Sequence, residues 1–160
     1  MQLSSRGQAW LLDTATAVAM FTGLILIFLA AWNSVAATRA GLAEYDGLQY
    51  SSALVASALV STGSPADWHI GAYMASSVPG ILEKSGVLSA QKMGRLQQLN
   101  GTGYDGIRTA TGAGKSHVFL NSSAGYWFGV PQANGSQSVA QTRLLALGGN
   151  ATTVTITVWR

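Results

Sequence analysis

The chain of 160 residues contains no cysteine and few charged residues. Without cysteine there is no disulfide framework, no thiolate nucleophile and no cysteine-ligated metal. Charged residues make up 9% of the chain, whereas about 25% is typical of soluble domains. The net charge of +3 comes from scattered Lys and Arg residues. No basic run offers a nucleic-acid-binding patch, so we expect no nucleic-acid partner.

Hydrophobic residues, in contrast, make up 48% of the chain. A long uncharged stretch extends from Thr14 to Thr38, with Asp13 and Arg39 on either side. A membrane-spanning helix needs about 20 mostly apolar residues. Trp10 and Trp32 stand near the two ends of the most apolar part, where indole rings favour the membrane interface. The sequence therefore predicts one N-terminal transmembrane helix in contact with a lipid bilayer.

The charges beside this stretch bear on its orientation. Arg6 is the only charged residue before Asp13, which favours a cytoplasmic N-terminus and an extracellular remainder. Arg39, close to the other end, weakens that argument. An alternative is a cleaved secretory signal peptide, with Ser34-Val35-Ala36 as a small-residue cleavage site. The apolar region of a signal peptide normally has about 7–15 residues, and this one is longer, so we expect the helix to be retained.

The residues before the apolar run form a recognisable order. Arg6-Gly7-Gln8 precedes the run, and the acidic Asp13 follows. This order resembles the class III signal peptide of archaeal type IV pilin-like proteins. The resemblance implies that a prepilin peptidase cuts between Gly7 and Gln8 on the cytoplasmic side and that the hydrophobic helix is kept. Asp13 is the sixth residue after this cut, whereas the better-known bacterial pattern has Glu at the fifth.

The same resemblance implies a role for the acidic residue and a set of partners. Asp13 would pair with the new amine on Gln8 of a neighbouring subunit. The partners would be copies of the chain or related pilins, the prepilin peptidase, and pilus assembly machinery with a separate ATPase. Alternatively, Asp13 is an interfacial acid that ends the span and favours the N-terminal end of the helix.

Beyond the span, a helical rhythm continues to Ser61. Apolar and small residues recur every three or four positions, at Leu42, Tyr45, Leu48, Ser52, Val55 and Leu59. Thr62-Gly63-Ser64-Pro65 then predicts the end of the helix. We therefore expect a leader peptide over 1–7, a transmembrane helix with its extracellular continuation over 8–62, and an extracellular α+β head over 63–160.

The head begins with an irregular stretch and short helices. Trp68 and Tyr73 are expected to anchor the stretch by packing. Ser89 is a candidate N-cap for a short helix, which would place Met93, Leu96 and Leu99 on one face. A further helical turn is expected over 105–111.

The rest of the head has the pattern of strands. Residues 116–120 alternate weakly, and 143–147 and 152–159 flank Gly148-Gly149-Asn150, which indicates a β-hairpin. In the last strand Val and Ile occupy one face and Thr the other, as expected for a strand with one buried side. The predicted fold is pilin-like α+β, with a long N-terminal transmembrane helix that continues onto a small antiparallel sheet.

Two patterns that suggest enzymatic sites are incomplete. The sequence TATGAGKS over Thr109 to Ser116 lacks the first glycine of the phosphate-binding loop, and a Gly-rich turn is the preferred interpretation. Asp67, His69 and His117 do not form a nucleophile-elbow pattern with any serine, and no cluster offers three or four metal ligands. We therefore expect no enzyme, no catalytic residue, no cofactor and no metal.

The remaining motifs are four N-glycosylation sequons, which begin at Asn100, Asn121, Asn134 and Asn150. Each falls in a predicted turn or strand end. Such short patterns also arise by chance in a chain rich in Ser and Thr. Their position after the span agrees with an external, glycosylated head.

These observations favour a membrane-anchored, pilin-like subunit of a surface filament, or a minor component of it, with a structural or adhesive role. The predicted location is the cell membrane, with a single span, a cytoplasmic N-terminus and an extracellular head. A monomeric anchored protein that binds an extracellular ligand is the main alternative. A membrane-tethered enzyme of unrecognised type is the second alternative, which the low charge content disfavours.

Overall fold

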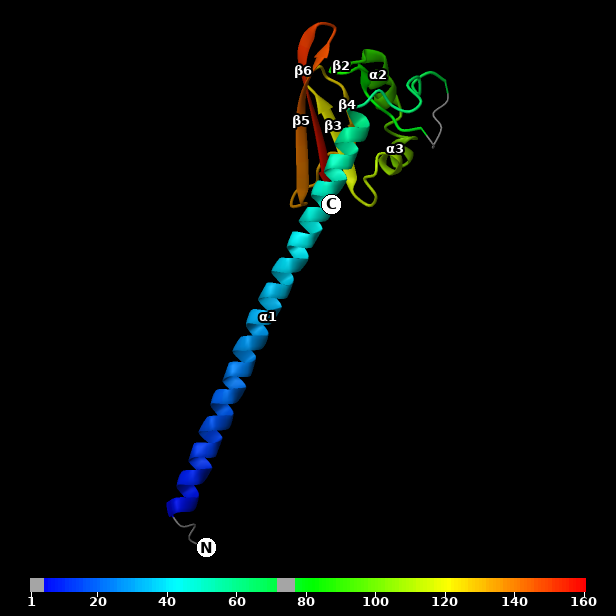
Figure 1. Ribbon diagram of the computed structural model, residues 1–160. Helices are drawn as coiled ribbons and strands as arrows, with labels where there is room; N and C mark the ends of the chain where they lie inside the picture. The colour runs from blue at the N-terminus through cyan, green and yellow to red at the C-terminus, as the bar shows by residue number, and fades with distance from the viewer. Residues whose placement is uncertain (1–4, 72–76) are drawn as a thin grey trace. The chain divides into compact units, whose positions relative to one another are not determined.

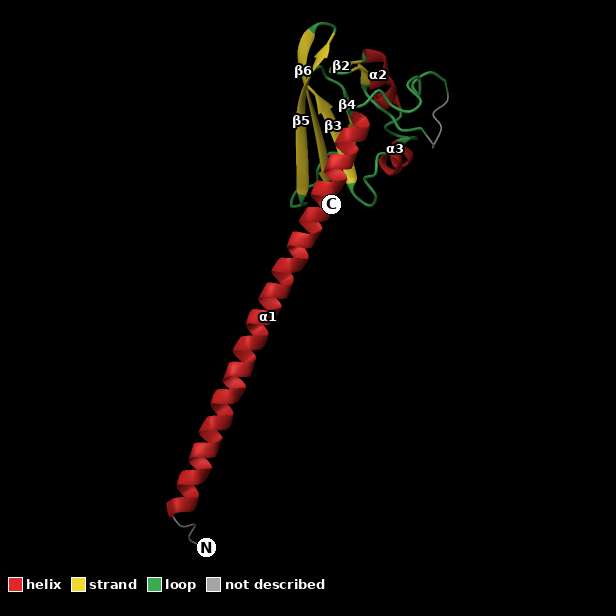
Figure 2. Ribbon diagram, in the orientation of Figure 1, coloured by secondary structure: helices red, strands yellow, loops and turns green. Residues whose placement is uncertain are grey.

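The computed structural model describes residues 5–71 and 77–160, with side chains from residue 10 onwards. This part of the chain contains three helices and six strands (Figures 1 and 2). In chain order they are α1 (Ser5–Leu59), β1 (Leu82–Lys84), β2 (Val87–Leu88), α2 (Ala90–Gln98), α3 (Tyr104–Ala110), β3 (His117–Ser122), β4 (Trp127–Gly129), β5 (Ser138–Leu147) and β6 (Asn150–Trp159). The fold class is therefore α+β, as predicted.

The chain divides into two compact units, and the division falls after Glu44, inside α1. The second unit, from Tyr45 to Arg160, contains the last part of α1 and all the strands. The predicted helix stop is confirmed, because α1 ends at Leu59, just before Thr62-Gly63-Ser64-Pro65. The leader predicted over 1–7 overlaps the start of α1, which begins at Ser5.

One stripe of α1 is buried in the head. Leu48, Ser52, Val55 and Leu59 are at most 1% exposed, and their spacing of four, three and four residues places them on one helical face. Leu42 and Tyr45, expected on the same face, are 59% and 42% exposed. The buried stripe thus begins at Leu48, six residues after Leu42, the first residue of the rhythm in the sequence.

The strands form a six-stranded sheet in the order β1-β2-β5-β6-β3-β4. All neighbours are antiparallel except β2 and β5, whose pairing of Val87 with Ala146 is parallel. The prediction of a purely antiparallel sheet is therefore wrong. The two-residue β2 joins the free edge of β5, and Ala146 N donates a hydrogen bond to Gly86 O at 2.9 Å.

The predicted C-terminal hairpin is confirmed as β5 and β6, although β5 begins earlier than expected, at Ser138. Val154, Ile156 and Val158 are fully buried and join the α1 stripe in one hydrophobic core. The intervening Thr residues of β6 face the other side of the sheet. The alternation of Val or Ile with Thr therefore decides which face of β6 lies on the helix.

The two short helices complete the core. Ser89 caps α2 as predicted, since its Oγ accepts a hydrogen bond from Lys92 N at 3.5 Å. Met93, Leu96 and Leu99 are buried, as expected. Helix α3 occupies nearly the range predicted for a helical turn and buries Ile107.

The segment that follows α1 passes close to the C-terminal end of that helix. Trp68 is buried, and its Nε1 donates a hydrogen bond to Gly80 O at 2.9 Å, which confirms it as a packing anchor. Tyr73 lies outside the described residues. A Cβ at Gly80 would collide with Ser61 O and Gly63 N, so glycine is needed where the returning chain passes the end of the helix.

Candidate functional site

The first candidate site is the apolar surface of α1 in the first unit. The large apolar side chains from Trp10 to Val35 are each 42–72% exposed. Among the described residues, one helix is long and apolar enough to cross a membrane, by length and composition. At 1.5 Å per residue, the uncharged stretch from Thr14 to Thr38 measures about 37 Å, enough for a hydrocarbon core about 30 Å thick.

Polar side chains within this stretch are partly satisfied by the helix itself. The hydroxyls of Thr14, Thr16, Thr22 and Thr38 each donate to the carbonyl four residues earlier, at 2.8–3.0 Å. An unpaired hydroxyl in hydrocarbon costs roughly 2–7 kcal/mol. These hydrogen bonds therefore make the threonines compatible with an apolar environment around the helix.

The residues of the predicted processing and pairing sites all lie in α1. Gly7 and Gln8 fall in its first turns, and Asp13 lies one to two turns further on. The side chain of Asp13 is exposed. Within the described part of the chain, the one ion pair joins Arg108 to Asp105, so Asp13 has no ionic partner among the side chains that the structure describes. It is available to a group outside the chain.

The four sequons differ in their surroundings. Asn121 is exposed in β3, Asn134 in the loop between β4 and β5, and Asn150 at the start of β6. Asn100 is half-buried, and its Oδ1 accepts a hydrogen bond from Gly129 N at 2.6 Å. Three asparagines therefore offer a free surface amide, whereas Asn100 holds β4 against the end of α2.

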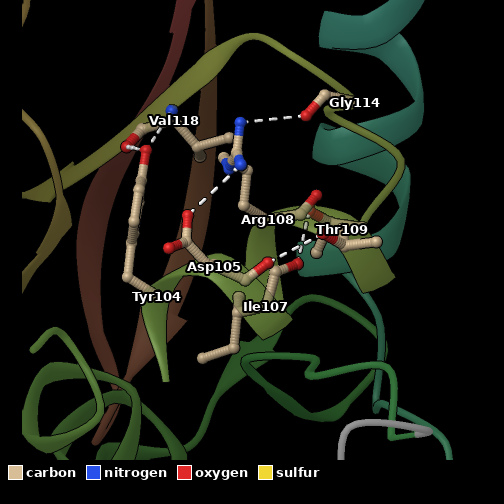
Figure 3. Close-up of polar contacts among 8 residues, drawn as sticks. Tyr104, Asp105, Ile107, Arg108, Thr109, Gly114 and Val118 are labelled. Carbon is tan, nitrogen blue, oxygen red and sulfur yellow. Dashed lines mark hydrogen bonds and ion pairs between the residues drawn. The ribbon is translucent and has the colours of Figure 1, made fainter. Parts of the chain in front are cut away.

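The Gly-rich segment TATGAGKS forms a turn between α3 and β3 (Figure 3). A phosphate-binding loop needs the opposite order, with a strand before the loop and a helix after it. Arg108 Nη1 donates to Gly114 O at 3.0 Å, and its Nη2 lies 3.2 Å from Asp105 Oδ1. Gly112 and Gly114 have positive φ angles of 84° and 60°. The interpretation as a Gly-rich turn is thus confirmed.

An open cleft of about 560 Å³ lies beside α2 and is lined in part by Asp67, His69, Glu83 and Lys92. Lys92 is buried, and its Nζ donates to Thr62 O at 2.6 Å and to Leu82 O at 2.8 Å. Burial lowers the pKa of Lys92, and the carboxylates of Glu83 and Asp67 oppose that shift. The Lys92 ammonium therefore links the segment just after α1 to β1 through two hydrogen bonds.

The two histidines occupy separate settings. His69 lines this cleft, whereas the ring of His117 in β3 stacks on Trp159, with centroids 4.5 Å apart. Trp159 Nε1 in turn donates to Val130 O at 3.0 Å. In the described ranges, no three His, Cys, Asp or Glu residues are grouped so as to hold a metal ion.

The sequence analysis missed a row of side chains across the sheet face opposite the core. Strand register pairs Thr142 with Thr155, Thr155 with Asn121, and Asn121 with Trp127. The row, here called the outer row, thus crosses β5, β6, β3 and β4 in turn. The outer row depends on the register between strands that are far apart in the sequence. The alternating Thr residues of β6 were the only local sign of such a row.

Comparisons with protein families, curated proteins and solved structures found no match for the chain.

Proposed function

We propose that the chain is a pilin-like, membrane-anchored subunit of a surface filament or a minor component of such a filament. The observation that carries the proposal is the exposed apolar surface of α1 from Trp10 to Val35, which contains a single acid, Asp13, near its start. A surface of this kind needs lipid, other helices or both around it. A helix that leaves the bilayer for a filament exchanges one apolar environment for the other.

The head agrees with an external role in this proposal. Its core is formed by the buried stripe of α1, the inner face of the sheet and the two short helices. Three sequon asparagines are exposed on it. The proposed location is therefore the cell membrane, with the N-terminus in the cytoplasm and the head outside. The chain would act as a structural or adhesive subunit rather than as an enzyme.

The test uses the absence of cysteine, because any introduced thiol is unique. Leu26→Cys places a thiol on the exposed apolar part of α1, where Leu26 is 61% exposed. Further single-cysteine variants scan the other exposed apolar positions along the helix. If the filament proposal is right, oxidation of membranes from cells that produce these variants should yield a ladder of disulfide-linked multimers. Lys84→Cys, at an exposed position in β1, is the control for random collisions.

The result also distinguishes the main alternative. A monomeric anchored binding protein predicts no crosslinks from any position on the helix beyond those of the control variant. Absence of a ladder across the whole scan would contradict the filament proposal and favour that alternative.

A further inference from the structure

The outer face of the sheet in strands β3 to β6 is almost free of charge. From Ser116 to Val158, Arg143 is the only Asp, Glu, Lys or Arg residue. Arg143 pairs in register with the buried Val154, so it belongs to the opposite face. The outer face therefore offers no fixed charge to a partner, which disfavours anionic and cationic ligands and suits a neutral one.

The outer row gives this face a defined chemistry. Trp127 is 43% exposed on the edge strand β4. Asn121 and Thr142 are exposed, and Thr155 lies between them. The hydroxyls of Thr142 and Thr155 are 3.2 Å apart. Because adjacent strands lie about 4.8 Å apart, the four positions form a line about 14 Å long.

We propose that the outer row binds a neutral polysaccharide that lies across the strands. The indole of Trp127 offers a flat apolar surface to the C–H face of a sugar ring. The amide of Asn121 and the two threonine hydroxyls can each both donate and accept hydrogen bonds, as sugar hydroxyls do. A dry protein contact would instead leave the Asn121 amide unpaired, at a cost of about 1–3 kcal/mol, whereas the two threonine hydroxyls already pair with each other.

The inference goes beyond the proposed function and does not depend on filament formation, because the outer row lies wholly in the second unit. The test uses the full chain in detergent micelles, from a host that does not glycosylate, because a glycan on the Asn121 sequon would cover the outer row. It is sedimented with insoluble cellulose, chitin and mannan as neutral probes and with calcium alginate gel as the anionic probe. The expected result is binding to at least one neutral polysaccharide and much weaker binding to alginate.

Variants then locate the binding. Trp127→Ala should weaken binding by about tenfold, as loss of one aromatic contact predicts, and Trp127→Phe should retain part of it. Thr142→Val with Thr155→Val removes both hydroxyls but keeps the branched shape, and should also weaken binding. Ile70→Ala, at a side chain 72% exposed on the head but outside the row, should bind as the wild type.

Several results would overturn the inference. They are no binding of the wild type to any neutral probe, equal binding to alginate, or unchanged binding by both Trp127→Ala and the double threonine variant. If Trp127→Ala abolishes multimers in the absence of polysaccharide and leaves sugar binding intact, the face is instead an interface between copies. Thermal unfolding of each variant identifies any loss of fold.

Discussion

At the scale of single residues, Asp13 is the side chain on which the filament proposal places most weight. It is exposed near the start of the apolar part of α1 and has no ionic partner among the described residues. An unpaired carboxylate costs much less at a membrane edge than at the bilayer centre. Its position is therefore compatible with a carboxylate that pairs with a group from another chain.

The first residue-scale prediction concerns Asp13→Ala. If Asp13 pairs with the amine of a neighbour's Gln8, the variant should insert normally but form fewer multimers. A broken buried pair costs about 3–5 kcal/mol, and the wet membrane edge should reduce this cost. Asp13→Asn should be intermediate, because the amide keeps a hydrogen bond and loses the charge. Crosslinking in membranes measures the effect, and equal crosslinking in all three proteins would make Asp13 a simple interfacial cap.

The second residue-scale prediction concerns Asn100. Its Oδ1 accepts from Gly129 N at 2.6 Å, so Asn100→Ala leaves that buried N–H unpaired. The expected loss is about 1–3 kcal/mol in the free energy of unfolding of the head. Asn100→Asp should retain most of the stability, since a carboxylate oxygen also accepts.

Urea unfolding of protein from a host that does not glycosylate measures this loss. Asn134→Ala removes another sequon asparagine at an exposed loop position, and we expect a change within about 0.5 kcal/mol. Equal stability of the two alanine variants would show that the Asn100 bond contributes nothing.

At the scale of elements, Tyr104 joins α3 to β3. Its hydroxyl accepts a hydrogen bond from Val118 N at 3.0 Å, and its ring packs against Phe128 with centroids 5.7 Å apart. Burial raises the pKa of Tyr104 above its ordinary value, while the hydrogen bond with Val118 acts in the opposite direction. The folded head therefore holds the Tyr104 proton more tightly than the unfolded chain does.

This shift predicts a pH dependence. Below about pH 10 Tyr104 is neutral in both states, so its stabilising contribution is fully present. As the pH rises through the raised folded pKa, that contribution is lost, because the unfolded chain releases the proton first. Tyr104→Phe should be less stable at neutral pH by about 0.5–1.5 kcal/mol.

Above about pH 10, Tyr104→Phe should also lose stability less steeply than the wild type. Urea midpoints across this pH range provide the measurement. Tyr50→Phe, at a side chain 69% exposed on α1, controls for the loss of one tyrosine. Parallel pH profiles of wild type and Tyr104→Phe would contradict the assignment.

The elements that the sequence predicted are those with strong local patterns. The alternation in β6, the glycines of the β5–β6 turn and the Ser89 cap all depend on residues close in the chain. In contrast, β1 and β2 have three and two residues, which is too short for any periodicity. The parallel pairing of β2 with β5 was missed because it joins Val87 to Ala146, far apart in the sequence.

Long-range contacts also limited the prediction of sites. Lys92 is a charged residue in a short helix, so its sequence context gave no sign that it is buried. Its burial depends on Thr62 O, 30 residues away. The outer row likewise needs the register of four strands. In contrast, the candidate processing and pairing residues are defined by their order along a short stretch of chain. The sequence alone could therefore identify them as Gly7, Gln8 and Asp13.

At the scale of the whole molecule, the two units have opposite surface chemistry. The first unit exposes every large apolar side chain from Trp10 to Val35, whereas the second has a hydrophobic core of its own. The filament proposal explains this contrast, since the first part would be covered by lipid or by neighbouring helices and the head would face water.

The position of the mature N-terminus tests the central claim of a processed, pilin-like anchor most directly. N-terminal sequencing and intact mass of protein extracted from the membranes of its native cells should give a chain that begins at Gln8 and retains α1. Gly7→Val should keep the full leader and still insert, because the span is unchanged. A wild-type chain that begins at Met1 or after Ala36, or equal processing of Gly7→Val, would contradict the account.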